Sequence, residues 1–145
     1  MTNETAASVQ DGGLAEHSLG EDEIQARVPI WTALAQLFSD NTMHSADYDA
    51  TAAELKGAGL DAAGARHILV HEVAPVFYEQ LTATEANWTG WSAEEVERMM
   101  REYLAKSFAR RKWLGVQAGR MSRRVMLGGW DAVERRMLAS EQAIP

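Results

Sequence analysis

The sequence predicts an all-α protein, a compact bundle of about five to six helices behind a disordered acidic N-terminal tail. Two observations favour this fold. Hydrophobic residues make up 46% of the 145 residues and recur at helical spacing, and the chain contains only three prolines. A chain of this length supports one domain with a hydrophobic core. We therefore expect a single helical domain at 23–140, with the tail at 1–22 and a flexible end at 141–145.

The first helix is expected to begin near Pro29, because the N–H that proline lacks would have no partner in a first helical turn. Residues 1–22, before it, are small, polar and acidic, with too little apolar surface to offset the entropy of ordering. Apolar residues then follow one helical face: Ile30, Trp31, Leu34, Leu37 and Phe38. We expect Trp31 in the core. A second helix is expected to be capped by Ser45 and Asp47 and to be stopped by Gly57 and Gly59.

The third helix is expected to begin after Asp61 and to kink or end at Pro75, which cannot donate to the carbonyl four residues back. Ser92 with Glu95 forms a capping box for the next helix. The inner face of that helix is predicted to carry Val96, Met99, Met100, Tyr103, Leu104 and Phe108.

The last helix is predicted to begin at a second capping box, Asp131 with Glu134, after the segment "GGW" breaks the preceding helix. This region belongs to a basic C-terminal part of the chain. Residues 1–97 hold 3 Lys/Arg and 17 Asp/Glu, whereas residues 98–145 hold 11 and 4, within a net charge of -7. An acidic front and a basic back indicate that charge has a role in packing or in binding.

Composition excludes several chemistries. The chain contains no cysteine, so thiol nucleophiles, disulfides and thiolate metal sites are excluded. No apolar run approaches the roughly 18 residues that span a bilayer, and the N-terminus does not have the pattern of a secretion signal. We expect a soluble cytoplasmic protein that does not bind membranes. Neither a phosphate-binding glycine loop nor a nucleophile elbow is present, so we expect no enzyme activity, no catalytic residue and no cofactor.

A resemblance to a known family is carried by three stretches: "IWTALAQLFSDN" (30–41), "HILVHEVAPVF" (67–77) and "NWTGW" (87–91). Together they resemble a family of small bacterial proteins with a domain of unknown function. The likeness covers residues 27–100 and rests on the order and spacing of these elements. It implies a compact helical bacterial domain and transfers no catalytic residue. The basic segment after residue 100 lies largely outside it.

Two histidines suggest a metal site. His67 and His71 are spaced i, i+4, which can hold zinc on one helix face, and Glu72 follows directly. The match to zinc-protease motifs is incomplete, because residues 68 and 70 are Ile and Val rather than Glu. The alternative is that both rings pack on the flank of a buried helix. Their titration near neutral pH could also make them a pH sensor.

Six basic residues could form a nucleic-acid footprint: Arg110, Arg111, Lys112, Arg120, Arg123 and Arg124. Phosphates attract cations, and the interleaved Trp113 could stack on bases. One alternative is that the basic residues belong to a solvated helix face, because acid–base pairs recur four residues apart, as at Glu97 and Arg101. Another is that they face the acidic half of the chain. A pI of about 5.1 also disfavours general nucleic-acid binding.

We expect the chain to be a non-enzymatic module that binds another protein, in the manner of immunity proteins or adaptors. A basic partner would suit the acidic residues clustered between the first two helices: Asp40, Asp47, Asp49 and Glu54. Trp88 and Trp91 flank a glycine turn, where tryptophan can belong to a core or to a partner surface. Nucleic-acid binding by the basic C-terminal part and metal binding by the histidines are the alternatives.

Overall fold

A computed structural model of the chain describes four segments: 19–38, 43–78, 90–121 and 125–142. Within these segments every regular element is helical, and the predicted all-α bundle is confirmed. Residues 1–18 of the expected tail lie outside the described residues, whereas Glu21 and Asp22 form the start of a helix. At the other end, the last helix extends to Gln142, inside the segment expected to be flexible, and 143–145 are not described.

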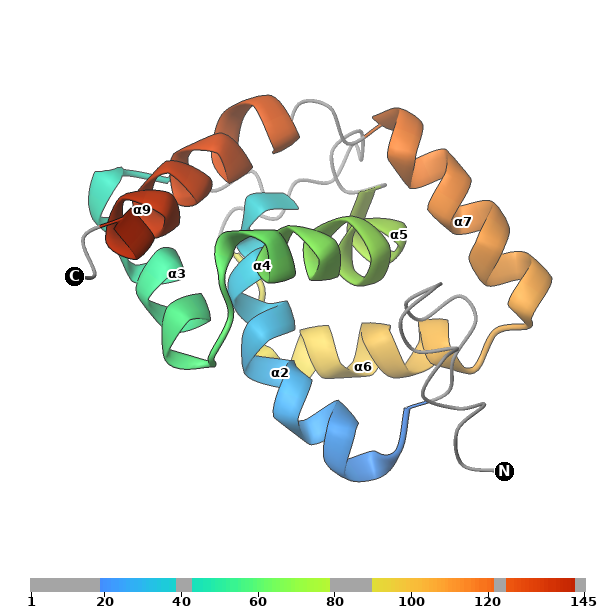
Figure 1. Cartoon of the computed structure of the whole chain (residues 1–145). Helices are drawn as coiled ribbons and strands as arrows, with labels where there is room; N and C mark the ends of the chain where they lie inside the picture. Colours follow the sequence, from blue (N-terminus) through green and yellow to red (C-terminus); the bar gives the residue numbers. More distant parts are fainter. Residues whose placement is uncertain (1–18, 39–42, 79–89, 122–124, 143–145) are drawn as a thin grey trace.

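A continuous helix from Ala62 to Phe77 runs through the middle of the bundle (Figure 1). The elements in chain order are α2 (Glu21–Ala35), η2 (Gln36–Phe38), α3 (Ser45–Gly57), α4 (Ala62–Ile68), η3 (Leu69–Val73), α5 (Ala74–Phe77), α6 (Ala93–Leu104), α7 (Phe108–Met121), η5 (Met126–Trp130) and α9 (Asp131–Gln142). Helix α2 packs on α3, α6 and η3. Helix α9 lies along α3 at one end of the molecule, and α7 packs on α5 at the other.

Helix α2 begins well before Pro29, so the predicted start of the first helix is wrong. Three acidic residues fill its first turn, where the helix dipole favours negative charge. The carboxylate of Glu23 also accepts a hydrogen bond from the N–H of Gly20 at 2.9 Å. Pro29 then lies inside the helix, where it removes one hydrogen bond to the carbonyl of Gln25. Packing of the apolar face offsets that loss.

The helix that contains Pro75 does not end there. Just before the proline, η3 is a π-helical turn in which the N–H of Ala74 donates to the carbonyl of Leu69, five residues back. Such a turn holds one residue more than an α-helical turn. Because it precedes a residue that has no N–H, the wider turn lets the chain continue as a helix to Phe77. The start of this helix is as predicted, since the Asp61 side chain accepts from Gly64 N–H at 2.7 Å.

A second π-helical turn, η5, carries "GGW" directly into α9. The expected helix break is therefore wrong, and Asp131 is not a cap because its own backbone is helical, with φ -56° and ψ -41°. Gly129 permits a close approach of η5 to η2. A Cβ atom at this position would lie 2.8 Å from Cδ2 of Leu37.

The core is built around large side chains from most of the helices. Trp31, as predicted, is completely buried, and Trp130, the last residue of η5, is buried as well. The predicted inner face of α6 is confirmed for Val96, Met100 and Tyr103, and its Ser92 and Glu95 capping box is present. Phe108 is the exception. Helix α6 ends at Leu104, so Phe108 begins α7 and is 49% exposed.

Candidate functional site

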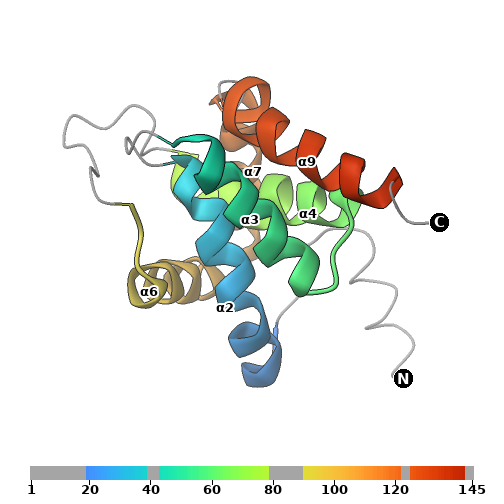
Figure 2. The ribbon, with the colours of Figure 1, turned by 90° about the vertical axis from the view of Figure 1, so that its left-hand side faces the viewer.

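A groove of about 390 Å³ lies between α2 and α3, which run side by side in Figure 2. Its apolar walls are formed by Val28, Pro29, Ala33, Ala50 and Ala93. Helix α2 supplies the first three of these residues, α3 supplies the fourth, and the fifth begins α6. The small side chains of the alanines keep the groove open where larger residues would fill it.

The uncharged polar groups that line this groove are used within the fold. Thr32 donates its hydroxyl to the carbonyl of Val28 at 2.7 Å, and Thr51 donates to the carbonyl of Asp47 at 3.0 Å. Gln36 bonds to backbone atoms of Thr32 and Trp91. These residues therefore present mainly their apolar parts to the groove.

Glu54 is the one charged residue among those that line the groove. It lies on α3 and is exposed, and its carboxylate makes no hydrogen bond or ion pair with any residue in the described segments. A carboxylate without a cation, at the edge of an apolar groove, is a suitable acceptor for a cationic side chain. Among the predicted acidic candidates in the described segments, Glu54 is therefore the one that lines the groove.

The other acidic candidates have different positions. Asp47 accepts the N–H of His44 at 2.8 Å and so caps its own helix. Asp49 lies 2.5 Å from Nε of Arg136 on α9. Asp40 lies outside the described residues. The structure therefore brings Asp47 and Asp49 into contacts within the fold and leaves Glu54 available.

Of the two tryptophan candidates, Trp88 is not described. Trp91 is half-buried and packs edge-on against Phe77, with ring centroids 5.1 Å apart. Its backbone N–H donates to Oε1 of Gln36 at 2.9 Å, and its carbonyl accepts from Nε2 of Gln36 at 2.8 Å. Gly90 precedes it with φ +85°, a conformation that favours glycine. These contacts give Trp91 a role in holding the start of α6 against α2.

The basic candidates within the described segments all lie on α7. Arg110, Lys112 and Arg120 are exposed, and Arg111 is half-buried. The guanidinium of Arg110 lies over the ring of Trp113, 4.8 Å from its centroid. Two further candidates, Arg123 and Arg124, are outside the described part of the chain.

On α6, the predicted pair of Glu97 and Arg101 is present at 2.9 Å, as expected for a solvated helix. Arg101 also contacts Glu21 of α2 at 2.5 Å, so part of the basic half does pair with the acidic half. Arg98 pairs with Glu102 at 3.6 Å.

His67 and His71 do lie together, with ring centroids 4.4 Å apart, and both are exposed. Partial burial, together with the nearby His67 and Lys112, lowers the pKa of His71. The described segments contain no group of three or more His, Asp or Glu residues placed to hold a metal ion. Glu72, which follows His71 in sequence, points into the protein instead. A zinc site at the histidines therefore stays a prediction that needs a further ligand.

Glu72 is the residue whose position the sequence reasoning missed. Its side chain is only 4% exposed, and it accepts hydrogen bonds from Arg27 at 2.9 and 3.2 Å and from Nε1 of Trp31 at 2.8 Å. Burial raises the pKa of Glu72, and Arg27, Trp31 and His67 oppose that rise. The sequence did contain a signal that Glu72 is buried, because its helical spacing places it on the same buried stripe as Ala65, Ile68 and Leu69.

This buried network is well suited to fix α2 against η3. Tyr103 of α6 lies near enough to Glu72 for the two charges to interact, and burial raises the pKa of Tyr103 as well. Each polar atom of the Glu72 carboxylate has a donor. The network therefore belongs to the architecture of the fold.

Comparison with known proteins adds a family. The family model described as "Domain of unknown function (DUF7079)" matches residues 25–136. The match extends through α7 and into α9, further than the resemblance over residues 27–100, so the basic C-terminal part is included. No curated protein and no solved structure matches the chain. Among the described helices, none has the length and apolar character needed to cross a membrane.

Proposed function

The chain belongs to the DUF7079 family of domains of unknown function, and we propose that it is a non-enzymatic module that binds a basic segment of another protein. The observation that carries this proposal is the groove between α2 and α3, which is apolar except for Glu54. Immunity proteins and adaptors work in this way, by presenting an acidic surface to a basic partner.

The groove has the chemistry to hold a lysine or arginine side chain. Such a side chain has an aliphatic stem and a cationic head. It binds most tightly where the stem contacts an apolar surface and the head contacts an acceptor. The stem can lie on Val28, Pro29 and Ala33, while the head reaches Glu54.

The charge of the whole chain favours the same partner. A net charge of -7 attracts basic proteins over distances up to about one Debye length, roughly 8–10 Å at physiological salt. Much of this charge lies in the N-terminal part, which also supplies both walls of the groove. Long-range attraction and the local acceptor therefore both favour a cationic partner.

The proposal can be tested with the full chain as bait for a phage library of random peptides. Peptides rich in Lys and Arg should be enriched, and their affinity should fall about tenfold when Glu54→Gln removes the charge. Ala50→Trp, which fills the groove, should abolish binding while Glu54 is still present. Glu102→Gln on α6 is the matched control, because it removes an exposed carboxylate away from the groove.

Two results would contradict the proposal. Enriched peptides without basic residues would mean that the groove does not select cations. Basic peptides that bind the Glu54→Gln and Ala50→Trp variants as well as the parent chain would place their site elsewhere.

The alternatives from the sequence stay predictions with their own tests. Nucleic-acid binding at α7 would appear as affinity for random-sequence DNA or RNA that falls steeply with salt. Zinc binding would appear as stoichiometric metal that is lost in both His67→Ala and His71→Ala.

A further inference from the structure

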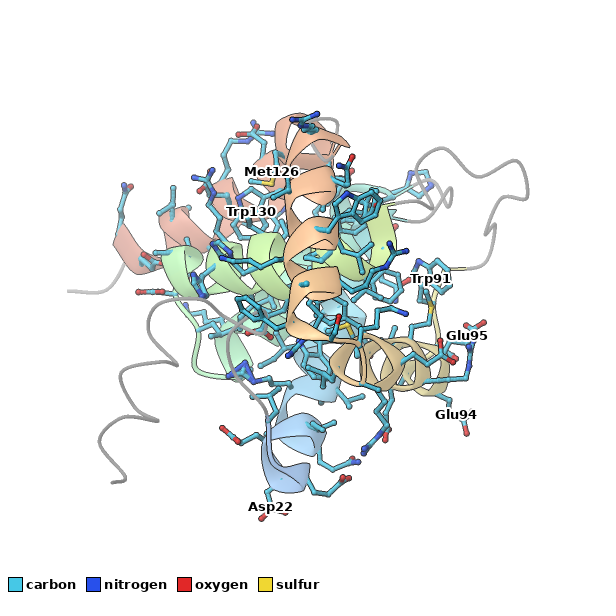
Figure 3. All side chains as sticks on the ribbon, turned by 90° about the vertical axis from the view of Figure 1, so that its right-hand side faces the viewer. Asp22, Trp91, Glu94, Glu95, Met126 and Trp130 are labelled. Carbon is cyan, nitrogen blue, oxygen red and sulfur yellow. The ribbon has the colours of Figure 1, made fainter. Side chains whose placement is uncertain are left out.

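The outer face of α7 exposes large apolar side chains to solvent. Phe108, Trp113 and Val116 are 49%, 48% and 56% exposed. The opposite side of the helix carries the buried Leu114 and Ala118, and it packs on α5 and η3. Figure 3 views the molecule from the side on which α7 lies, and no described helix lies in front of α7.

Cations surround these apolar groups. Every charged residue of α7 is basic, and Arg110, Lys112 and Arg120 are exposed. Arg110 lies 4.8 Å from the ring centroid of Trp113, and Nζ of Lys112 lies 5.9 Å from that of Phe108. These contacts hold aromatic rings and positive charges side by side on one surface.

The stability of the helix does not explain this arrangement. The first turn of α7 contains no acidic residue, and three consecutive cations follow within its first five positions. Positive charge near a helix N-terminus is unfavourable with respect to the helix dipole. Gly115 in the interior further lowers helix propensity. A helix selected only for packing would not combine these features with exposed aromatic residues.

We propose that the outer face of α7 is a second docking surface, which binds an acidic protein segment that carries apolar side chains. This partner has the opposite charge to the partner proposed for the groove. The proposal rests on the exposed residues of α7 and does not depend on the groove. Carboxylates of the segment pair with Arg110, Lys112 and Arg120, and its apolar residues cover Trp113 and Val116.

The observations favour a protein segment over the other polyanionic partners. Val116 is the most exposed large apolar residue in the described segments, and it offers nothing to a phosphate backbone. The net charge of -7 repels nucleic acids and anionic membranes as whole bodies. A short acidic segment has fewer charges to repel and can supply both carboxylates and apolar contacts.

The same phage library on the full chain tests this surface separately from the groove. A second class of enriched peptides is expected, rich in Asp and Glu with interspersed Leu, Ile, Phe or Trp. Their affinity should fall at least about tenfold in Trp113→Ala and in Val116→Ser, and Arg120→Glu should also weaken them. Glu54→Gln should leave the affinity of this class unchanged, whereas it should weaken the basic class about tenfold.

Three outcomes would overturn the proposal. The first is that no acidic class is enriched. The second is an acidic class that binds Trp113→Ala and Val116→Ser, with circular dichroism unchanged, as tightly as the parent chain. The third is that random-sequence duplex DNA or phosphatidylglycerol vesicles bind through Trp113 and Arg120 more tightly than any selected peptide. In that case α7 is a nucleic-acid or membrane surface.

Discussion

Glu72 is a carboxylate held almost entirely away from water. Its two oxygens accept hydrogen bonds from Arg27 and Trp31, which partly offset the cost of removing a charge from solvent. A buried ion pair of this kind contributes little net stability compared with apolar residues of the same shape. The three side chains meet only when α2 is correctly placed along η3, because Arg27 and Trp31 lie on α2 and Glu72 lies on η3.

Removing the carboxylate should be costly. Glu72→Ala is expected to lower the free energy of unfolding by about 3 kcal/mol, because Arg27 and the indole N–H of Trp31 lose their acceptor inside the protein. Glu72→Gln should cost less, since its amide oxygen can still accept from Trp31. Urea unfolding followed by circular dichroism measures both. A loss below about 1 kcal/mol for Glu72→Ala would mean that the pair is not buried in solution.

The raised pKa of Glu72 has a consequence for the pH dependence of stability. The folded chain keeps this proton at pH values where the unfolded chain, with a pKa near 4.5, has released it. Between these two pKa values the folded state binds more protons, so stability falls as pH rises through that window. Glu72→Gln lacks this contribution. The difference in unfolding free energy, Glu72→Gln minus parent, should therefore increase as pH rises above about 4.5.

Helix ends illustrate which elements local sequence can specify. The cap at Asp61, the capping box at Ser92 and the stop at Gly57 were predicted correctly, because their hydrogen bonds join residues only a few positions apart. Pro29 and "GGW" misled the prediction. Each disfavours a helix locally, and each is overruled by packing against distant residues, as Gly129 shows against Leu37.

Two glycine substitutions should act in opposite directions. Gly90→Ala is expected to destabilise the protein by about 2 kcal/mol, because φ is +85° and the new Cβ would lie 2.6 Å from Oε1 of Gln36. Gly115 lies inside α7, where an added Cβ would meet no atom outside its own helix backbone and chain neighbours within 4 Å. Gly115→Ala should therefore stabilise the protein by about 0.5–1 kcal/mol. Thermal unfolding of the two variants checks the signs, and a stabilising Gly90→Ala would refute the assigned backbone conformation.

At the scale of the whole molecule, the acidic and basic halves of the sequence meet in the fold. Arg101 of α6 pairs with Glu21, and Arg136 of α9 pairs with Asp49. Arg136 also bonds to Ser45 at 3.1 Å and lies over the ring of Tyr48. At the end of α9, Glu141 accepts the N–H of Ala62 at 2.8 Å. Part of the charge asymmetry is thus used to close the bundle.

This closure can be measured at Arg136. Arg136→Met keeps the stem of the side chain and removes its charge, and it should lower the free energy of unfolding by about 1 kcal/mol at low salt. The loss should shrink in about 0.5 M NaCl, where surface charges are screened. Arg135→Met is the matched control, since Arg135 pairs only within its own helix, with Asp131, in the described segments. Equal losses in the two variants would argue against a long-range role.

The fold class was predictable from the sequence because hydrophobic periodicity reports helices directly. The site was predictable only in part. Glu54 was recognised as acidic and near the first two helices, but the groove beside it depends on how closely α2 and α3 approach. The inward turn of Glu72 depends on Arg27, which is distant in sequence, and no local pattern reveals such a partner.

The π-helical turn at η3 makes the number of residues in the central helix as important as their identity. Because Leu69–Val73 holds one residue more than an α-helical turn, deleting one residue there would leave an α-helical turn and keep Phe77 on the same face. Each residue turns a helix by about 100°, so deleting one residue from α4 would instead rotate everything after it relative to everything before. Phe77, completely buried at the end of that helix, would then leave the core, and α7 would lose the surface on which it packs. Variation in this family should therefore tolerate the loss of one residue within Leu69–Val73 and exclude it within α4.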